Sequence, residues 1–179
     1  NRYETMVKQE ERYDPNMATS SEQIGSSTAW AAGYTGAGSK IAIIDTGIDI
    51  DHQSFSAAGY DHSMELLAKD AGMTLDAYKK SVGVLDAAGI ADVFSQLNIV
   101  AGIAAANKYI ANADGTFSNA LETAKVQGVA PDAQLVVMKV FGYGGGAYDS
   151  DYMAAIEDAI VLGCDSINLS LGSSDPGFT

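Results

Sequence analysis

The sequence predicts an α/β fold in which a parallel β-sheet is flanked by helices on both faces, with a helical insertion. Three short apolar runs indicate buried strands, at residues 40–44, 135–140 and 166–171. Helical spacing of apolar residues separates them, over residues 100–110 and again over 151–162. Strands that alternate with helices are typical of βαβ units, whose sheets are parallel and covered on both sides.

The first strand carries the most informative residue. Its apolar run leads directly into Asp45, and Thr46-Gly47 ends it. Sites in open α/β sheets lie at the carboxyl ends of the strands. A buried carboxylate needs a partner, and one common partner is a histidine whose tautomer and orientation it fixes. The alternative is an aspartate that only caps the following turn.

Composition narrows the class of protein. A chain of 179 residues that is 47% hydrophobic with 19 glycines is long enough for one globular domain with a real core. A formal net charge of −13 argues against nucleic acid or an anionic membrane as a partner. No apolar run reaches the length of about 18 residues that a membrane span needs, so we expect none in this chain.

The remaining segments are assigned from pattern alone. Residues 1–16 are polar and read as an extended arm. A helix is expected to start near Ser20 or Ser21, with Ile24 and Trp30 on its apolar stripe, and Gly33 ends it. Three short helices are expected at 63–71, 74–82 and 84–97, within a surface insertion over about residues 56–98, and a loop at 112–116.

Four motifs in order resemble a known family. They are Asp45-Thr46-Gly47, the helix from Val100 to Asn107, the turn Gly128-Val129-Ala130-Pro131, and Ser170-Leu171-Gly172. In order and content they resemble the subtilisin-like serine proteases (subtilases), and most of all the large cell-envelope proteinases of Gram-positive bacteria. The resemblance covers about residues 14–172. It implies the N-terminal part of a subtilase catalytic domain, with the subtilisin-like sheet, at residues 17–179.

The resemblance implies a serine endopeptidase with an Asp-His-Ser triad, of which only the aspartate is found. Asp45 matches the catalytic aspartate. The histidine is expected just before Val100, where the sequence reads Gln96-Leu97-Asn98-Ile99 and holds no general base. The serine motif Gly-Thr-Ser-Met does not occur in the sequence. His52 matches a non-catalytic family histidine, and His62 is expected in a surface loop.

The junction of Ile99 and Val100 is therefore suspect. The family has a strand and a loop between its aspartate and its histidine, whereas here one helical pattern runs into another without Gly or Pro. We expect that a segment with the strand and the histidine is missing between these two residues. Two alternatives stay open: a true deletion that leaves an inactive homologue acting as a binding or regulatory module, and a second chain that carries the serine.

Two backbone edges are expected to bind an extended substrate, one at the end of the last strand and one at the glycine loop. The alternatives are a plain buried strand end and a loop that touches nothing. The predicted substrate-binding residues are Ser170, Leu171, Gly172, Gly144, Gly145, Gly146 and Tyr148.

The expected partners are protein or peptide substrates and a propeptide, and the expected location is secreted or cell-wall associated. Residues 1–16 match the place where a subtilase propeptide ends, with cleavage near Tyr13; a mature N-terminal arm is the alternative. No cofactor is expected to be required for catalysis. A structural calcium ion is left open, because Ser54 stands where many subtilases carry an aspartate ligand, and Asp49, Asp51 and Asp114 are acidic loop residues.

Overall fold

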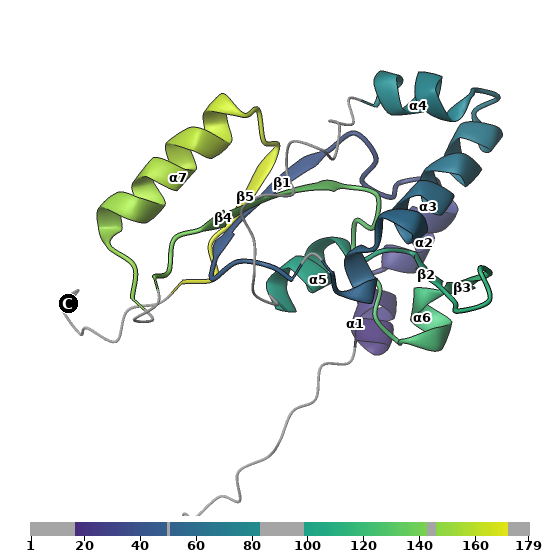
Figure 1. Ribbon diagram of the computed structural model, residues 1–179, viewed down its shortest axis with the longest axis horizontal. Coiled ribbons are helices and arrows are strands. Elements are labelled where there is room, and N and C mark those ends of the chain that lie inside the picture. Colours follow the sequence, from purple (N-terminus) through teal and green to yellow (C-terminus); the bar gives the residue numbers. More distant parts are fainter. Residues whose placement is uncertain (1–16, 50, 83–98, 143–145, 172–179) are drawn as a thin grey trace, which may run out of the picture.

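The computed structural model describes residues 17–49, 51–82, 99–142 and 146–171 (Figure 1). Its elements are α1 (Met17–Gln23), α2 (Ser26–Ala31), β1 (Lys40–Asp45), the 3₁₀ turn η1 (Gln53–Phe55), α3 (Ala57–Asp70), α4 (Leu75–Ser81), α5 (Ile99–Ala105), β2 (Tyr109–Ala111), β3 (Phe117–Asn119), α6 (Ala120–Thr123), β4 (Gln134–Lys139), α7 (Asp149–Val161) and β5 (Ser166–Asn168).

Three parallel strands form the central sheet in the order β4-β1-β5. All six residues of β1 pair with β4, from Lys40 opposite Gln134 to Asp45 opposite Lys139. The pairing with β5 is shorter and ends with Ile43 opposite Asn168. The predicted α/β class and parallel sheet are confirmed, although β5 ends three residues before the predicted Leu171.

Helices cover the sheet on both sides. Figure 1 shows α5 and α7 on opposite sides of the strands, and α5 packs on β4 while α7 packs on β1. Alternate residues of a strand point to opposite faces. Ile43 and Val137 accordingly join Ala101 of α5 in one core cluster. On α7, Ala155 and Ala159 are the buried positions, and their four-residue spacing marks the face that meets the sheet.

The Gly-Val-Ala-Pro turn closes the carboxyl end of α5. Backbone N–H groups of residues 128–130 donate to the carbonyl groups of Ala106, Ile103 and Ala104, at 3.1, 3.0 and 2.9 Å respectively. The last carbonyl groups of a helix have no partner within the helix, so this turn satisfies them. The approach is close enough that a Cβ on Gly128 would lie 2.4 Å from the Ala105 Cα.

The expected helix over residues 100–110 is wrong in its second half. Helix α5 ends at Ala105, and residues 109–111 form β2, which pairs antiparallel with β3. Asn107 causes the change of direction: its N–H donates to the Ser54 carbonyl at 2.7 Å, and its Nδ2 donates to the Ser56 carbonyl at 2.8 Å. The expected loop at 112–116 is the turn of this β2–β3 hairpin.

The expected single helix near the N-terminus is also wrong. Gly25 adopts a φ of 78° and divides the segment into α1 and α2. Ile24 is 67% exposed and lies on no buried stripe. Trp30 is held instead by its indole Nε1, which donates to the Val129 carbonyl at 2.9 Å and ties α2 to the turn below α5.

Two helices occupy the start of the region where we expect an insertion. Helix α3 has Ser56 as its N-cap and begins at Ala57, six residues before the predicted start. Helix α4 has Thr74, the predicted start, as its N-cap. Helix α3 packs on α4 and β2, with Met64 fully buried. The third expected helix, 84–97, lies outside the described residues. That the whole segment is an insertion remains a prediction.

Two buried polar groups, Asp132 in the turn before β4 and the Tyr60 hydroxyl on α3, have raised pKa values. Asp132 is 1% exposed, and its N–H donates to the Thr35 carbonyl at 3.0 Å. Burial raises the pKa of the Asp132 carboxyl. Burial, with further contributions from Asp132 and Asp61, raises the pKa of Tyr60 to about 12. Within the described part of the chain, nothing hydrogen-bonds to the buried Tyr60 hydroxyl.

Gly128→Ala should destabilise the fold, because the added Cβ meets the backbone of α5. Forcing a methyl group into a packed site typically costs about 1–3 kcal/mol. Gly102→Ala is the matched control, because its added Cβ would meet nothing within 4 Å. Within a helix, alanine is more stabilising than glycine by roughly 0.5–1 kcal/mol, so this variant should not lose stability. Urea denaturation followed by circular dichroism measures both. Equal midpoints for the two variants would contradict the close packing.

Tyr60→Phe should reduce the loss of free energy of unfolding that occurs at alkaline pH. Because the folded pKa of Tyr60 is about 12 and the ordinary tyrosine value is 10.0, the free energy of unfolding of the parent falls as pH rises through that window. The variant should lose less there, and at neutral pH it should be no less stable, since the removed hydroxyl had no partner. Urea midpoints at pH 8 and pH 11.5 test this. Parallel pH curves for parent and variant would refute it.

Candidate active site

Asp45 closes the central strand of the sheet. Its Oδ1 accepts a hydrogen bond from the Thr46 N–H at 2.6 Å, and its backbone carbonyl accepts one from the Val140 N–H at 3.1 Å. The side chain is half-buried. The carboxylate is thus held by its own turn and the backbone of Asp45 by the residue after β4, at the edge of the sheet where α/β proteins build sites.

Ser170 lies at the same edge of the sheet as Asp45. Paired residues of β1 and β5 end with Ile43 and Asn168, and Asp45 and Ser170 each follow two residues later. Ser170 Oγ donates to Asn168 Oδ1 at 2.9 Å. Leu171 follows, half-buried, and Gly172 lies outside the described residues. The start of the predicted substrate edge therefore lies at the same end of the sheet as Asp45, and its role in binding stays a prediction.

The glycine loop adjoins a cavity. The Gly142 N–H donates to the Gly146 carbonyl at 3.1 Å. Gly142, Gly146 and Tyr148, with Ala147, line a cavity of about 430 Å³. The Tyr148 side chain is 79% exposed, and its N–H donates to Asp151 Oδ2 at 3.2 Å, which caps α7. Gly144 and Gly145 lie outside the described residues.

Lys139 adjoins the candidate site, and the sequence analysis did not single it out. It pairs with Asp45 across β1 and β4, and its Nζ donates to the Thr46 carbonyl at 2.7 Å. A positive charge therefore lies at the strand ends, bound to the turn that follows the candidate carboxylate. In the sequence Lys139 is a single charged residue within an apolar run, which becomes informative once the strand register is known.

Both histidines are engaged in the fold. His52 Nδ1 accepts a hydrogen bond from the Ser54 N–H at 3.2 Å and caps the 3₁₀ turn. His62 lies in α3 and not in the expected loop. Its ring stacks on Phe117 at 4.2 Å and meets the Tyr109 ring edge-on at 4.8 Å. These contacts favour structural roles for His52 and His62.

The acidic loop residues form local hydrogen bonds. Asp49 Oδ1 accepts from the Asp51 N–H at 3.0 Å. Asp114 Oδ1 accepts from the Thr116 hydroxyl at 2.6 Å and N–H at 3.0 Å, and these bonds lower the pKa of Asp114. Among the described residues, no three His, Cys, Asp or Glu side chains are grouped as metal ligands. Structural calcium therefore stays a prediction.

In the described ranges, no helix combines the length and the apolarity needed to cross a bilayer.

Comparison with known proteins gives consistent matches. Residues 36–179 match the sequence pattern of the family described as the Subtilase family. The chain is 35% identical over 170 residues to the minor extracellular protease Vpr of Bacillus subtilis (strain 168). That alignment covers 92% of this chain and 18% of the Vpr protein.

Two relatives of lower sequence identity are also named as proteases. The PII-type proteinase of Lacticaseibacillus paracasei is 30% identical over 185 residues, covering 93% of this chain and 9% of that protein. The human membrane-bound transcription factor site-1 protease is 26% identical over 146 residues, covering 82% of this chain and 10% of that protein. The chain thus spans less than a fifth of the length of these relatives.

Proposed function

This chain belongs to the subtilase family, and on that premise we propose that the protein is a serine endopeptidase that hydrolyses peptide bonds in proteins through an Asp-His-Ser triad. Asp45 is the triad member in this chain. One observation carries the proposal: within the matched residues, Asp45 closes the central strand of a parallel sheet and its carboxylate is held by the Thr46 N–H.

The chemistry assigns one task to Asp45. The serine attacks the peptide carbonyl, the histidine takes the serine proton, and the aspartate orients the histidine and stabilises its charged form. Such a group must be held rigidly. The bonds from Thr46 and Val140 supply that rigidity, and the Lys139 bond to the Thr46 carbonyl supports the same turn.

The proposal needs a histidine and a serine from outside this sequence. We place the histidine in a segment that belongs between Ile99 and Val100, which here follow one another in α5. The alignment with the Lacticaseibacillus proteinase runs over 185 positions and the chain has 179 residues, so some positions of that relative have no counterpart here. That difference is compatible with a segment absent from this sequence and does not locate it.

Substrate would bind as an extended strand on the two predicted edges, Ser170 to Gly172 and Gly144 to Gly146 with Tyr148. Main-chain pairing gives affinity and the adjoining hollows give selectivity. The cavity of about 430 Å³ next to Gly146 and Tyr148 suits a substrate side chain. We propose a secreted or cell-wall location, which fits the relative named a minor extracellular protease.

A second candidate function is an inactive homologue that binds or regulates other proteins. The observation that favours it is the uninterrupted course of α5 from Ile99 into Val100, with no general base at its start. The two functions differ in whether the complete gene product reacts with a serine-directed inhibitor.

Asp45→Asn in the complete gene product should lower kcat by about 10⁴, because the histidine would lose its correct tautomer. Asp49→Asn is the matched control, since Asp49 stands on the same connection and only accepts the Asp51 N–H. Hydrolysis of a chromogenic peptide measures both. A loss below tenfold in Asp45→Asn would reject the triad role, and a parent that is already inactive would establish the second function.

N-terminal sequencing of the purified active enzyme should find a start between Tyr13 and Met17, if residues 1–16 end a propeptide. Cleavage directly at Asp14–Pro15 is disfavoured, because proline lacks the N–H and restricts the residue before it. A mature chain that starts at or before Asn1 would show that residues 1–16 are an arm of the enzyme.

A further inference from the structure

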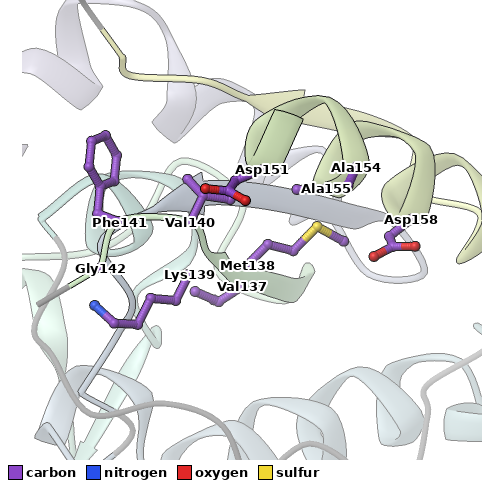
Figure 2. A pocket seen from close by; sticks show the side chains of 10 residues that line it. All are labelled: Val137, Met138, Lys139, Val140, Phe141, Gly142, Asp151, Ala154, Ala155 and Asp158. Carbon is purple, nitrogen blue, oxygen red and sulfur yellow. The ribbon is translucent and has the colours of Figure 1, made fainter. Parts of the chain in front are cut away.

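The two sides of the central sheet are covered differently. On the side of α7, a groove of about 650 Å³ stays open between the helix and β4 (Figure 2). On the side of α5, Ala101 packs against Ile43 and Val137, and the connection that follows β1 is tied to the residues just after α5. That tie is a junction between η1, the start of α3 and the start of β2, and its central residue is Asn107.

Asn107 bonds to the connection after β1 through two donors. Its backbone N–H donates to the Ser54 carbonyl at 2.7 Å, and its Nδ2 donates to the Ser56 carbonyl at 2.8 Å. Asn107 is 4% exposed and Ser54 is 7% exposed, so the junction is closed to water. Because the Ser56 group is a carbonyl and can only accept, the amide nitrogen of Asn107 must face it, which fixes the orientation of the side chain.

The family resemblance implies a metal ligand at this junction. Ser54 stands where many subtilases carry an aspartate ligand for calcium. Calcium takes roughly six to eight oxygen ligands, with carboxylates among them. The residues present do not fit that requirement. Ser54 offers a neutral hydroxyl, and the carbonyl groups of Ser54 and Ser56 face the N–H donors of Asn107.

The first turn of α3 packs closely over the Asn107 amide. A Cβ on Gly59 would lie 2.4 Å from the Tyr109 carbonyl oxygen and 3.2 Å from Asn107 Nδ2. The Gly59 N–H donates to Ser56 Oγ at 3.3 Å, which caps the helix directly above the junction. A group as small as a methyl therefore does not fit between α3 and β2 here, and the amide itself fills the junction.

We propose that the Asn107 amide takes the place of a cation at this junction, so that the connection after Asp45 is held to the end of α5 without calcium. An N–H group presents positive charge to a carbonyl oxygen, as a cation does. A neutral hydrogen-bonded amide can be buried without a carboxylate to balance it, whereas a buried ion needs charged partners. The proposal concerns this junction alone.

The junction matters for the candidate site because of the two elements that it joins. Strand β1 ends at Asp45, and the chain then runs through Thr46 to η1. Helix α5 is the helix before which the triad histidine is expected. Asn107 therefore fixes the segment after Asp45 relative to that helix. The inference depends on the hydrogen bonds of the junction and not on proteolytic activity, so its test needs no substrate.

Amide hydrogen exchange of the complete gene product, in excess calcium chloride and in EGTA, tests the proposal. The Phe55 N–H donates to the His52 carbonyl at 2.8 Å within η1, so its exchange reports opening of the junction. Ile43 lies in β1 between β4 and β5, so its amide is the internal reference for global opening. The ratio of the two exchange rates should differ by less than about threefold between calcium and EGTA.

Asn107→Asp removes the side-chain donors and keeps the size of the side chain. In EGTA it should accelerate the exchange of Phe55 relative to Ile43 by roughly tenfold, as expected for the loss of a buried hydrogen bond. Asn112→Asp is the matched control, because the Asn112 amide donates to Thr116 and Ser118 within the β2–β3 hairpin. It should leave the ratio unchanged.

Two results would overturn the proposal. One is a parent protein in which EGTA raises the ratio by more than about threefold, since a cation would then hold the junction. The other is an Asn107→Asp variant whose ratio in EGTA stays within about threefold of the parent's or matches that of Asn112→Asp, since the amide would then not be what holds it. If Asn107→Asp does not fold, the comparison of the parent in calcium and in EGTA decides by itself.

Discussion

The pairing of β1 with β4 is the interaction on which the central sheet and the candidate site depend. Residues 40–45 and 134–139 are almost a hundred positions apart in sequence, yet they pair along their whole length. That register sets Lys139 beside Asp45. It also fixes where α5 must end, because the turn that enters β4 is the one that closes α5.

Close approach of backbone to backbone makes that arrangement specific. Gly128 permits contact with the end of α5 that no other residue allows, and Trp30 binds the same turn through the Val129 carbonyl. Immediately after this turn, the buried Asp132 donates its N–H to the Thr35 carbonyl, and its charge adds to the burial that raises the pKa of Tyr60 on α3. One short segment therefore connects the sheet, α5 and α2.

The candidate site depends on the carboxyl ends of the parallel strands. Asp45 and Ser170 each follow two residues after the last paired residues of β1 and β5, so both lie at one edge of the sheet. The Lys139 Nζ donates to the Thr46 carbonyl and supports the turn that follows Asp45. The proposed triad role of Asp45 therefore depends on strand register as well as on the residue itself.

The sequence by itself determined the elements whose signals are local. Apolar runs identified the three strands of the sheet, and the position of Asp45 at the end of the first run identified the candidate site. Only the tertiary structure decided where α5 ends, how the β2–β3 hairpin forms and that Lys139 pairs opposite Asp45 and binds the Thr46 carbonyl. Those features depend on contacts between distant residues, such as Asn107 with Ser54 and Gly128 with Ala105, and periodicity carries no information about such contacts.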